Sequence, residues 1–237
     1  MFTRRCDEEG SVFRTECALG RWVPRLVPRV SARSPDLCGP IWARVSAMQA
    51  AGGAGPRPLF GGALSAVLPP AARDASELRE IPDNQEVFAH RHGDQSLIVE
   101  LLEYQGQVAD RDAARYHFED IAGGNEALER GSFEVTGVVQ VSGSEVSLAD
   151  CSSAWTLTGT QRVSKFSEEA RNTVRLHLGL FRLPRFSTDV LVTFNDPQSI
   201  SPDSSSAAAG SHREPWTEQD FRVLLQTLSL HDPALFG

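Results

Sequence analysis

Cysteine is scarce in most of this 237-residue chain. Three of its four cysteines, Cys6, Cys17 and Cys38, lie in the first 47 residues, and only Cys151 lies beyond them. This distribution excludes a disulfide framework and favours a reducing compartment. The chain also has no run of about 18 apolar residues, so no transmembrane helix is predicted.

Motifs of covalent and nucleotide chemistry are missing too. The sequence contains no G-x-S-x-G, no Walker A loop and no G-x-G-x-x-G, which argues against the serine-hydrolase, P-loop and dinucleotide sites that these motifs build. Cys151 has no neighbouring sequence that would activate a thiol. The residue patterns therefore indicate an acidic interaction domain rather than an enzyme that makes or breaks covalent bonds.

One short pattern suggests metal chemistry. His90, His92 and Asp94 spell H-x-H-x-D, but Gln95 stands where a fuller metallohydrolase pattern would place another histidine. A metal site also needs ligands from elsewhere in the chain, and only four further histidines are available. We predict a polar loop and no metal site here, and keep a metal-dependent hydrolase as a minor alternative.

The charge is unevenly distributed. The net charge is −8, yet residues 1–47 contain eight arginines and only five acids. The remainder holds 15 of the 23 basic and 26 of the 31 acidic residues, a net charge of −11. Nucleic acids and anionic membranes both require a cationic surface, so neither is an expected partner. An acidic body favours a basic protein partner.

Residues 1–57 differ from the rest of the chain. They are rich in Arg, Pro, Gly and Ala and show no sustained period of 2 or 3.6. A transit peptide is one interpretation, but Asp7-Glu8-Glu9 is unusual in such peptides. We predict an unstructured leader, with Met48 as a possible internal start, and a single domain over residues 58–237.

The first half of this domain predicts two strands and two helices. Strands are expected over Ala63–Leu68 and Glu86–His90, and Asp74 is expected to cap a short turn. Asp94–Tyr104 predicts an amphipathic helix, because its leucines and Ile98 would share one face. A second helix is predicted over Asp112–Ala122, where His117 would lie near Asp120 in a structural role.

In the second half the apolar period changes to 2. Strands are predicted over residues 133–141, 155–163, 173–183 and 190–194, the last two as an antiparallel hairpin. Residues 196–214 predict a mobile loop, and Thr217 begins the last helix, with Trp216 and Phe221 as a hydrophobic staple. Leu178–Phe181 is apolar on both parities, which requires cover on both faces of the sheet. The fold class expected is therefore α+β, an α/β/α sandwich around a largely antiparallel sheet.

A turn between two apolar segments organises the domain. In Leu78–Phe88, LREIPDNQEVF, Pro82 fixes its own φ and Asn84 favours a turn. Asp83 and Glu86 are acids on either side of that turn. From composition alone this is an ordinary acidic turn before a strand.

Six segments together resemble a known family. They are LFGGALSAVLPP, LREIPDNQEVF, DQSLIVELLEY, ARYHFEDIA, FRLPRFSTDVLVTFN and LHDPALFG, which lie between Leu59 and Gly237. On these segments the chain resembles the Ran guanine nucleotide release factor family and looks mammalian-like. The resemblance does not extend to residues 1–47. It implies a fold similar to that of the photosystem II extrinsic subunit.

The resemblance also implies a function. Members of this family bind the small GTPase Ran, promote loss of its guanine nucleotide in nuclear transport, and use no cofactor. It assigns the Ran contact to Asp83 and Glu86, with Pro82, Asn84 and Gln85 as possible flanking contacts. It further implies a location in nucleus and cytoplasm. We expect a monomer by default.

The resemblance to mammalian members adds a second partner. It implies a role in bringing the cardiac voltage-gated sodium channel to the cell surface, and hence a peripheral location at the plasma membrane. The alternative is a trafficking adaptor that binds a cytoplasmic loop of the channel and has no exchange activity.

Overall fold

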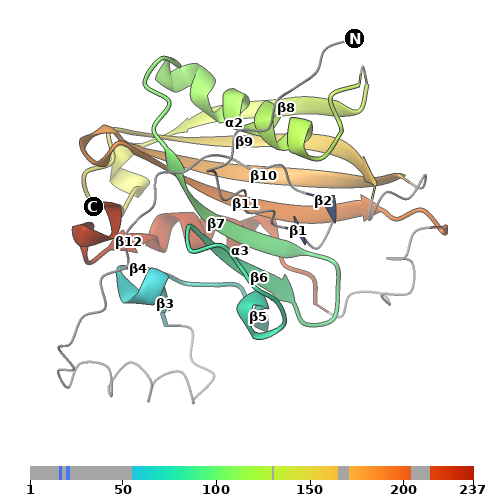
Figure 1. The fold of residues 1–237 in the computed structure, drawn as a ribbon, viewed down its shortest axis with the longest axis horizontal. Helices are drawn as coiled ribbons and strands as arrows, with labels where there is room; N and C mark the ends of the chain where they lie inside the picture. The colour runs from blue at the N-terminus through green and yellow to red at the C-terminus, as the bar shows by residue number, and fades with distance from the viewer. Residues whose placement is uncertain (1–15, 18–19, 22–54, 130, 165–170, 204–213) are drawn as a thin grey trace, which may run out of the picture.

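The computed structural model describes residues 16–17, 20–21, 55–129, 131–164, 171–203 and 214–237 (Figure 1). Within the predicted leader, β1 (Glu16–Cys17) and β2 (Gly20–Arg21) form a short antiparallel pair. The rest of residues 1–54 lies outside the described residues. The first element of the body is β3, which begins at Arg57.

An antiparallel sheet of seven strands forms the centre of the fold. Its order is β5-β6-β7-β11-β10-β9-β8, and every neighbouring pair is antiparallel. In chain order the strands are β5 (Ala72–Asp74), β6 (Gln85–His90), β7 (Ser96–Glu103), β8 (Phe133–Val141), β9 (Ser153–Ser164), β10 (Arg171–Leu183) and β11 (Thr188–Ser199). The predicted hairpin is β10–β11, and residues 176–183 of β10 are buried on both parities. The sheet therefore needs cover on both faces.

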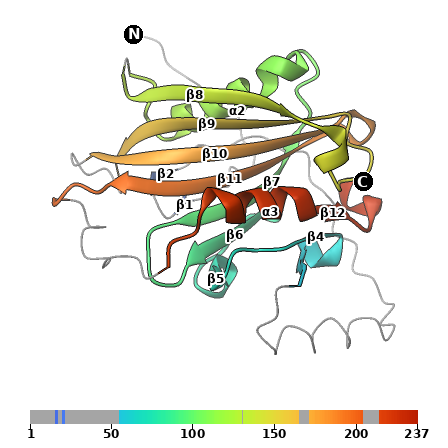
Figure 2. The same cartoon turned by 180° about the vertical axis from the view of Figure 1, so that it is seen from behind.

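Each face is covered by one helix. Helix α2 (Asp110–Gly124) lies over one face, as Figure 1 shows, and packs its buried side chains in a cluster with residues of β9 and β10. Helix α3 (Glu218–Thr227) lies over the opposite face (Figure 2). Beside α3 runs a small sheet of β3 (Arg57–Leu59), β4 (Leu64–Ala66) and β12 (Ser229–Leu230). This arrangement confirms the predicted α/β/α sandwich.

The predicted helix over Asp94–Tyr104 is wrong, because this segment forms strand β7. Its spacing of leucines fits a helix, but residues 96–102 are all buried, as in a strand with a neighbour on each side. Leu97 and Val99 join the core under α3, whereas Ile98 and Leu102 point to the other face. Glu100, within this strand, is only 6% exposed.

Other predictions are confirmed with small shifts. Thr217 caps α3 in a capping box with Asp220, and Trp216 before it is buried. Asp74 caps the short 3-10 turn η2 (Ala75–Glu77). Strand β11 continues to Ser199, into the predicted loop 196–214, of which residues 204–213 lie outside the described residues. No helix in the described ranges is long and apolar enough to cross a membrane.

Further 3-10 turns join these elements. They are η1 (Phe60–Gly62), η3 (Gly143–Glu145), η4 (Pro184–Phe186) and η6 (Pro233–Phe236).

Gly159 of β9 leaves no room for a side chain beneath Phe118 of α2. A Cβ at this position would lie 2.6 Å from the Glu134 carbonyl oxygen and 2.6 Å from Cζ of Phe118. We therefore expect Gly159→Ala to lower the free energy of unfolding by about 1–3 kcal/mol, measured by urea denaturation. Gly137→Ala, where a Cβ would meet nothing within 4 Å, is the control. Equal effects of the two substitutions would contradict this packing.

Candidate functional site

The turn predicted to organise the domain leads directly into β6. The amide of Gln85 donates to the Pro82 carbonyl at 2.9 Å and closes the turn. Pro82 is half-buried, and Asp83, next along the chain, is exposed. The first carboxylate of the predicted acidic pair is therefore presented to solvent at the start of β6.

The side chains of Asn84 and Gln85 form hydrogen bonds to residues of β7. The Asn84 side chain donates to the Leu101 carbonyl at 3.2 Å, while its own carbonyl accepts from the Leu101 amide at 2.9 Å. Nε2 of Gln85 donates to Oε1 of Glu100 at 2.7 Å. Both predicted flanking residues thus fasten β6 to its neighbour, and their hydrogen-bonding groups are directed at β7 rather than at solvent.

Glu86 has a different environment from Asp83. Its side chain is half-buried, and Oε1 accepts a 2.6 Å hydrogen bond from the backbone amide of Phe60. Burial raises the pKa of the Glu86 carboxyl above its ordinary value of 4.5, and the Asp74 carboxylate adds to the rise. The Phe60 amide and the Arg57 guanidinium oppose it. Asp83 therefore lies in the turn and is exposed, whereas Glu86 lies just after it in β6 and is half-buried.

Phe60, whose amide donates to Glu86, is the first residue of η1. Phe60, Gly61 and Gly62 have φ angles of 49°, 65° and 94°, three consecutive residues in the left-handed region. Glycine adopts this region freely, whereas a phenylalanine there is strained. Such strain persists only where neighbouring contacts enforce it. The Glu86 hydrogen bond to the Phe60 amide is one of those contacts.

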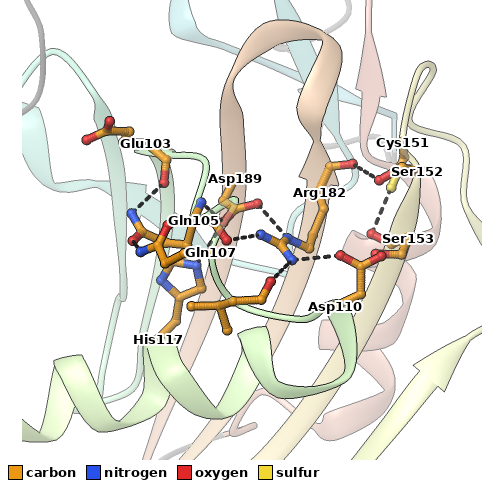
Figure 3. Close-up of polar contacts among 11 residues, drawn as sticks. Glu103, Gln105, Gln107, Asp110, His117, Cys151, Ser152, Ser153, Arg182 and Asp189 are labelled. Carbon is orange, nitrogen blue, oxygen red and sulfur yellow. Dashed lines mark hydrogen bonds and ion pairs between the residues drawn. The ribbon is translucent and has the colours of Figure 1, made fainter.

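A second charged cluster, which the sequence analysis missed, lies inside the domain. Arg182 of β10 is fully buried, and its Nε donates to Oδ1 of Asp189, its cross-strand partner on β11, at 3.1 Å. Nη1 donates to Oδ1 of Asp110 at 2.7 Å, as Figure 3 shows. The available signal was this opposite-charge pair on either side of the predicted hairpin turn.

The same guanidinium holds the loop between β7 and α2. It donates to the Gln105 carbonyl at 2.7 Å and to the Val108 carbonyl at 2.9 Å, and it lies 4.3 Å from the centre of the Tyr104 ring. His117 of α2 contacts the other oxygen of Asp189, Oδ2, at 3.1 Å (Figure 3). His117 and Asp120 both lie in α2, as their predicted i, i+3 spacing requires. Because these groups are buried and mutually paired, the cluster has a structural role.

The remaining candidates lack reactive geometry. Burial raises the pKa of the Cys151 thiol, whose Sγ donates to the Ser153 carbonyl, so the thiolate is disfavoured. His90 lies 3.2 Å from the Glu214 carbonyl and accepts from the His92 amide through Nδ1. Within the described part of the chain, no group of three or more His, Cys, Asp or Glu side chains is arranged to hold a metal ion.

Comparison with known proteins decides the family. The model of the family "Ran-interacting Mog1 protein" matches residues 57–197, which is more than half of the chain. The chain belongs to the Mog1 family. The match begins with β3 and includes the acidic turn and most of the seven-stranded sheet. Residues 1–56 lie outside it.

Curated relatives cover the same region. The chain is 64% identical over 181 residues to a Ran guanine nucleotide release factor of Danio rerio, covering 76% of the chain and 99% of the relative. Its identity to the Homo sapiens protein of the same name is 46% over 186 residues, with 76% and 95% covered. A Schizosaccharomyces pombe relative, 35% identical with 72% and 90% covered, is named nuclear import protein mog1. The chain is thus more similar to the fish protein than to the human one.

A solved Mog1 structure shares the fold. The crystal structure of the Saccharomyces cerevisiae Ran-binding protein Mog1p matches with a TM-score of 0.58 and 23% sequence identity. The match covers 77% of this chain and 98% of the yeast chain. At this identity the likeness supports the Mog1 fold of the body, and nothing finer is drawn from it.

The buried cluster predicts a large loss of stability on substitution. Arg182→Leu would leave the buried Asp189 carboxylate without its cation, so we expect the free energy of unfolding to fall by about 3–5 kcal/mol. Arg185→Leu is the matched control, because Arg185 pairs with Asp150 while 71% exposed. Its effect should be at most about 1 kcal/mol. Similar losses for both variants in urea denaturation would contradict a buried ion pair at Arg182.

The raised pKa of Glu86 predicts how stability depends on pH. A folded-state pKa above the ordinary 4.5 means that the folded chain binds the proton more readily than the unfolded chain. The stabilisation that protonation of Glu86 provides is therefore lost as pH rises from 4.5 through the higher folded-state pKa. Relative to Glu86→Gln, which cannot titrate there, the unsubstituted chain should gain stability as pH falls from neutral towards 4.5. Denaturation of both proteins across this range measures the difference, and a constant or opposite trend would contradict the assignment.

Proposed function

We propose that this chain binds the small GTPase Ran and promotes release of its guanine nucleotide, acting in nucleocytoplasmic transport in nucleus and cytoplasm. Membership of the Ran-interacting Mog1 family carries the proposal. The names of the relatives support it, since they describe Ran guanine nucleotide release and nuclear import. The acidic body is suited to a partner with a basic surface.

Asp83 is the residue that we assign to direct contact with Ran. It is exposed in a turn whose neighbouring side chains are held by β7, so the carboxylate is presented from a rigid base. A GTPase holds its nucleotide through a P-loop lysine and Mg²⁺. A carboxylate placed nearby competes for the lysine or disturbs the segment that holds the metal, and release accelerates without covalent chemistry.

The test is dissociation of labelled nucleotide from Ran. Asp83→Ala should lower the accelerated rate at least about tenfold, because an interfacial charge pair is lost. Glu119→Ala is the control, since Glu119 is an exposed acid on α2, over one face of the sheet and away from the turn. If Asp83→Ala and the control release nucleotide equally fast, Asp83 is not the contact. If the unsubstituted chain gives no acceleration, a binding adaptor without exchange activity replaces the proposal.

Charge steering makes a separate prediction. Exposed charges are screened over about 8 Å at physiological ionic strength and over about 30 Å at 0.01 M. Association of the chain with Ran should therefore slow as salt is added, and the slope should be shallower for Asp83→Ala. Stopped-flow association at several salt concentrations measures both. An association rate independent of salt would rule out steering.

A further inference from the structure

The Glu86 carboxylate is directed at its own chain. Oε1 accepts a short hydrogen bond from the Phe60 amide nitrogen, at 2.6 Å. The contact joins residues that are 26 positions apart in sequence. It connects β6, the second strand of the large sheet, to the turn between β3 and β4 in the small sheet.

That turn is fixed at its base and exposed at its apex. Leu59 and Leu64, on either side of it, are 1% and 0% exposed in the core. The Ala63 amide donates to the Phe60 carbonyl at 3.2 Å and closes the turn. Gly61, at the apex, is exposed, and a Cβ there would meet nothing within 4 Å. A partner backbone can approach this apex closely because no side chain covers it.

Two uses of Glu86 make different demands on its side chain. A salt bridge to a basic residue of a partner requires the negative charge. Holding the Phe60 amide requires only an acceptor oxygen in the same place, which a glutamine also supplies. In the structure the second use is the one made, since Oε1 accepts from the amide of Phe60, a residue with a left-handed φ of 49°.

We propose that Glu86 is a positioning residue, which holds the Phe60–Gly62 turn so that its apex forms part of the Ran-binding surface beside Asp83. This inference rests on the proposed function and deepens it. The acceptor oxygen of Glu86, rather than its charge, is what binding requires. The partner surface it fits is a backbone segment of the GTPase that packs against Gly61, next to a cation that meets Asp83.

Three substitutions distinguish a need for the charge of Glu86 from a need for its hydrogen-bond acceptor. Glu86→Gln keeps the acceptor and removes the charge, Glu86→Ala removes both, and Asp83→Asn removes the charge that we assign to direct contact. In the nucleotide-release assay we expect Glu86→Gln to stay within about twofold of the unsubstituted chain, and the other two to lose about tenfold or more. Loss of activity in Glu86→Gln equal to that in Glu86→Ala would overturn the proposal, as would full activity in Glu86→Ala.

Hydrogen exchange reports on the turn independently of Ran. The Phe60 amide should exchange faster in Glu86→Ala than in the unsubstituted chain, and at an unchanged rate in Glu86→Gln and Asp83→Asn. Unchanged exchange in Glu86→Ala would show that Glu86 does not hold the turn. If the unsubstituted chain releases no nucleotide, the proposed function fails, and these exchange rates still decide the positioning role.

A fourth variant tests whether the apex meets the partner. Gly61→Asn tolerates the left-handed conformation and adds a side chain at the exposed apex. We expect a loss of Ran binding, measured by titration, without faster exchange at Phe60. Binding equal to that of the unsubstituted chain would overturn the placement of the turn in the interface.

Discussion

The ion pair between Arg182 and Asp189 is the constraint on which one end of the sheet depends. Both side chains are fully buried, so each charge needs the other. Their hydrogen bonds join the β10–β11 hairpin to the β7–α2 loop and to His117 of α2. Strand β7 pairs with β11 of this hairpin, and β6 pairs with β7. The acidic turn is therefore supported by a base that cannot shift without breaking a buried charge pair.

Much of the fold could be predicted from sequence because local signals agreed with it. The predicted helix start at Thr217 and the two apolar segments of the β10–β11 hairpin are such signals. Strand β7 shows where such reasoning fails. Its run SLIVELL satisfies a helical stripe, and only the presence of β6 and β11 on either side makes it a buried strand. The periodicity of a segment alone does not show which strands lie beside it.

The site shows the same limit at the level of single side chains. The sequence placed Asp83 in a turn and Glu86 at the start of the next strand, and the structure confirms both placements. Sequence could not show that Glu86 faces the Phe60 amide, because that contact spans 26 residues and depends on how the small sheet packs. Arg182 was missed for a related reason, since Asp189 across the hairpin was the one signal, and the contacts of Arg182 with Asp110 and the β7–α2 loop span more than 70 residues. Both omissions concern polar groups whose partners are distant in sequence.

Release of labelled GTP and GDP from purified Ran, as a function of the concentration of the unsubstituted chain, tests the central claim most directly. The account predicts that the nucleotide leaves faster in the presence of the chain. Acceleration at substoichiometric amounts would indicate an exchange factor that turns over, and acceleration only at stoichiometric amounts a release factor that traps nucleotide-free Ran. A dissociation rate that stays the same at every concentration would contradict the account.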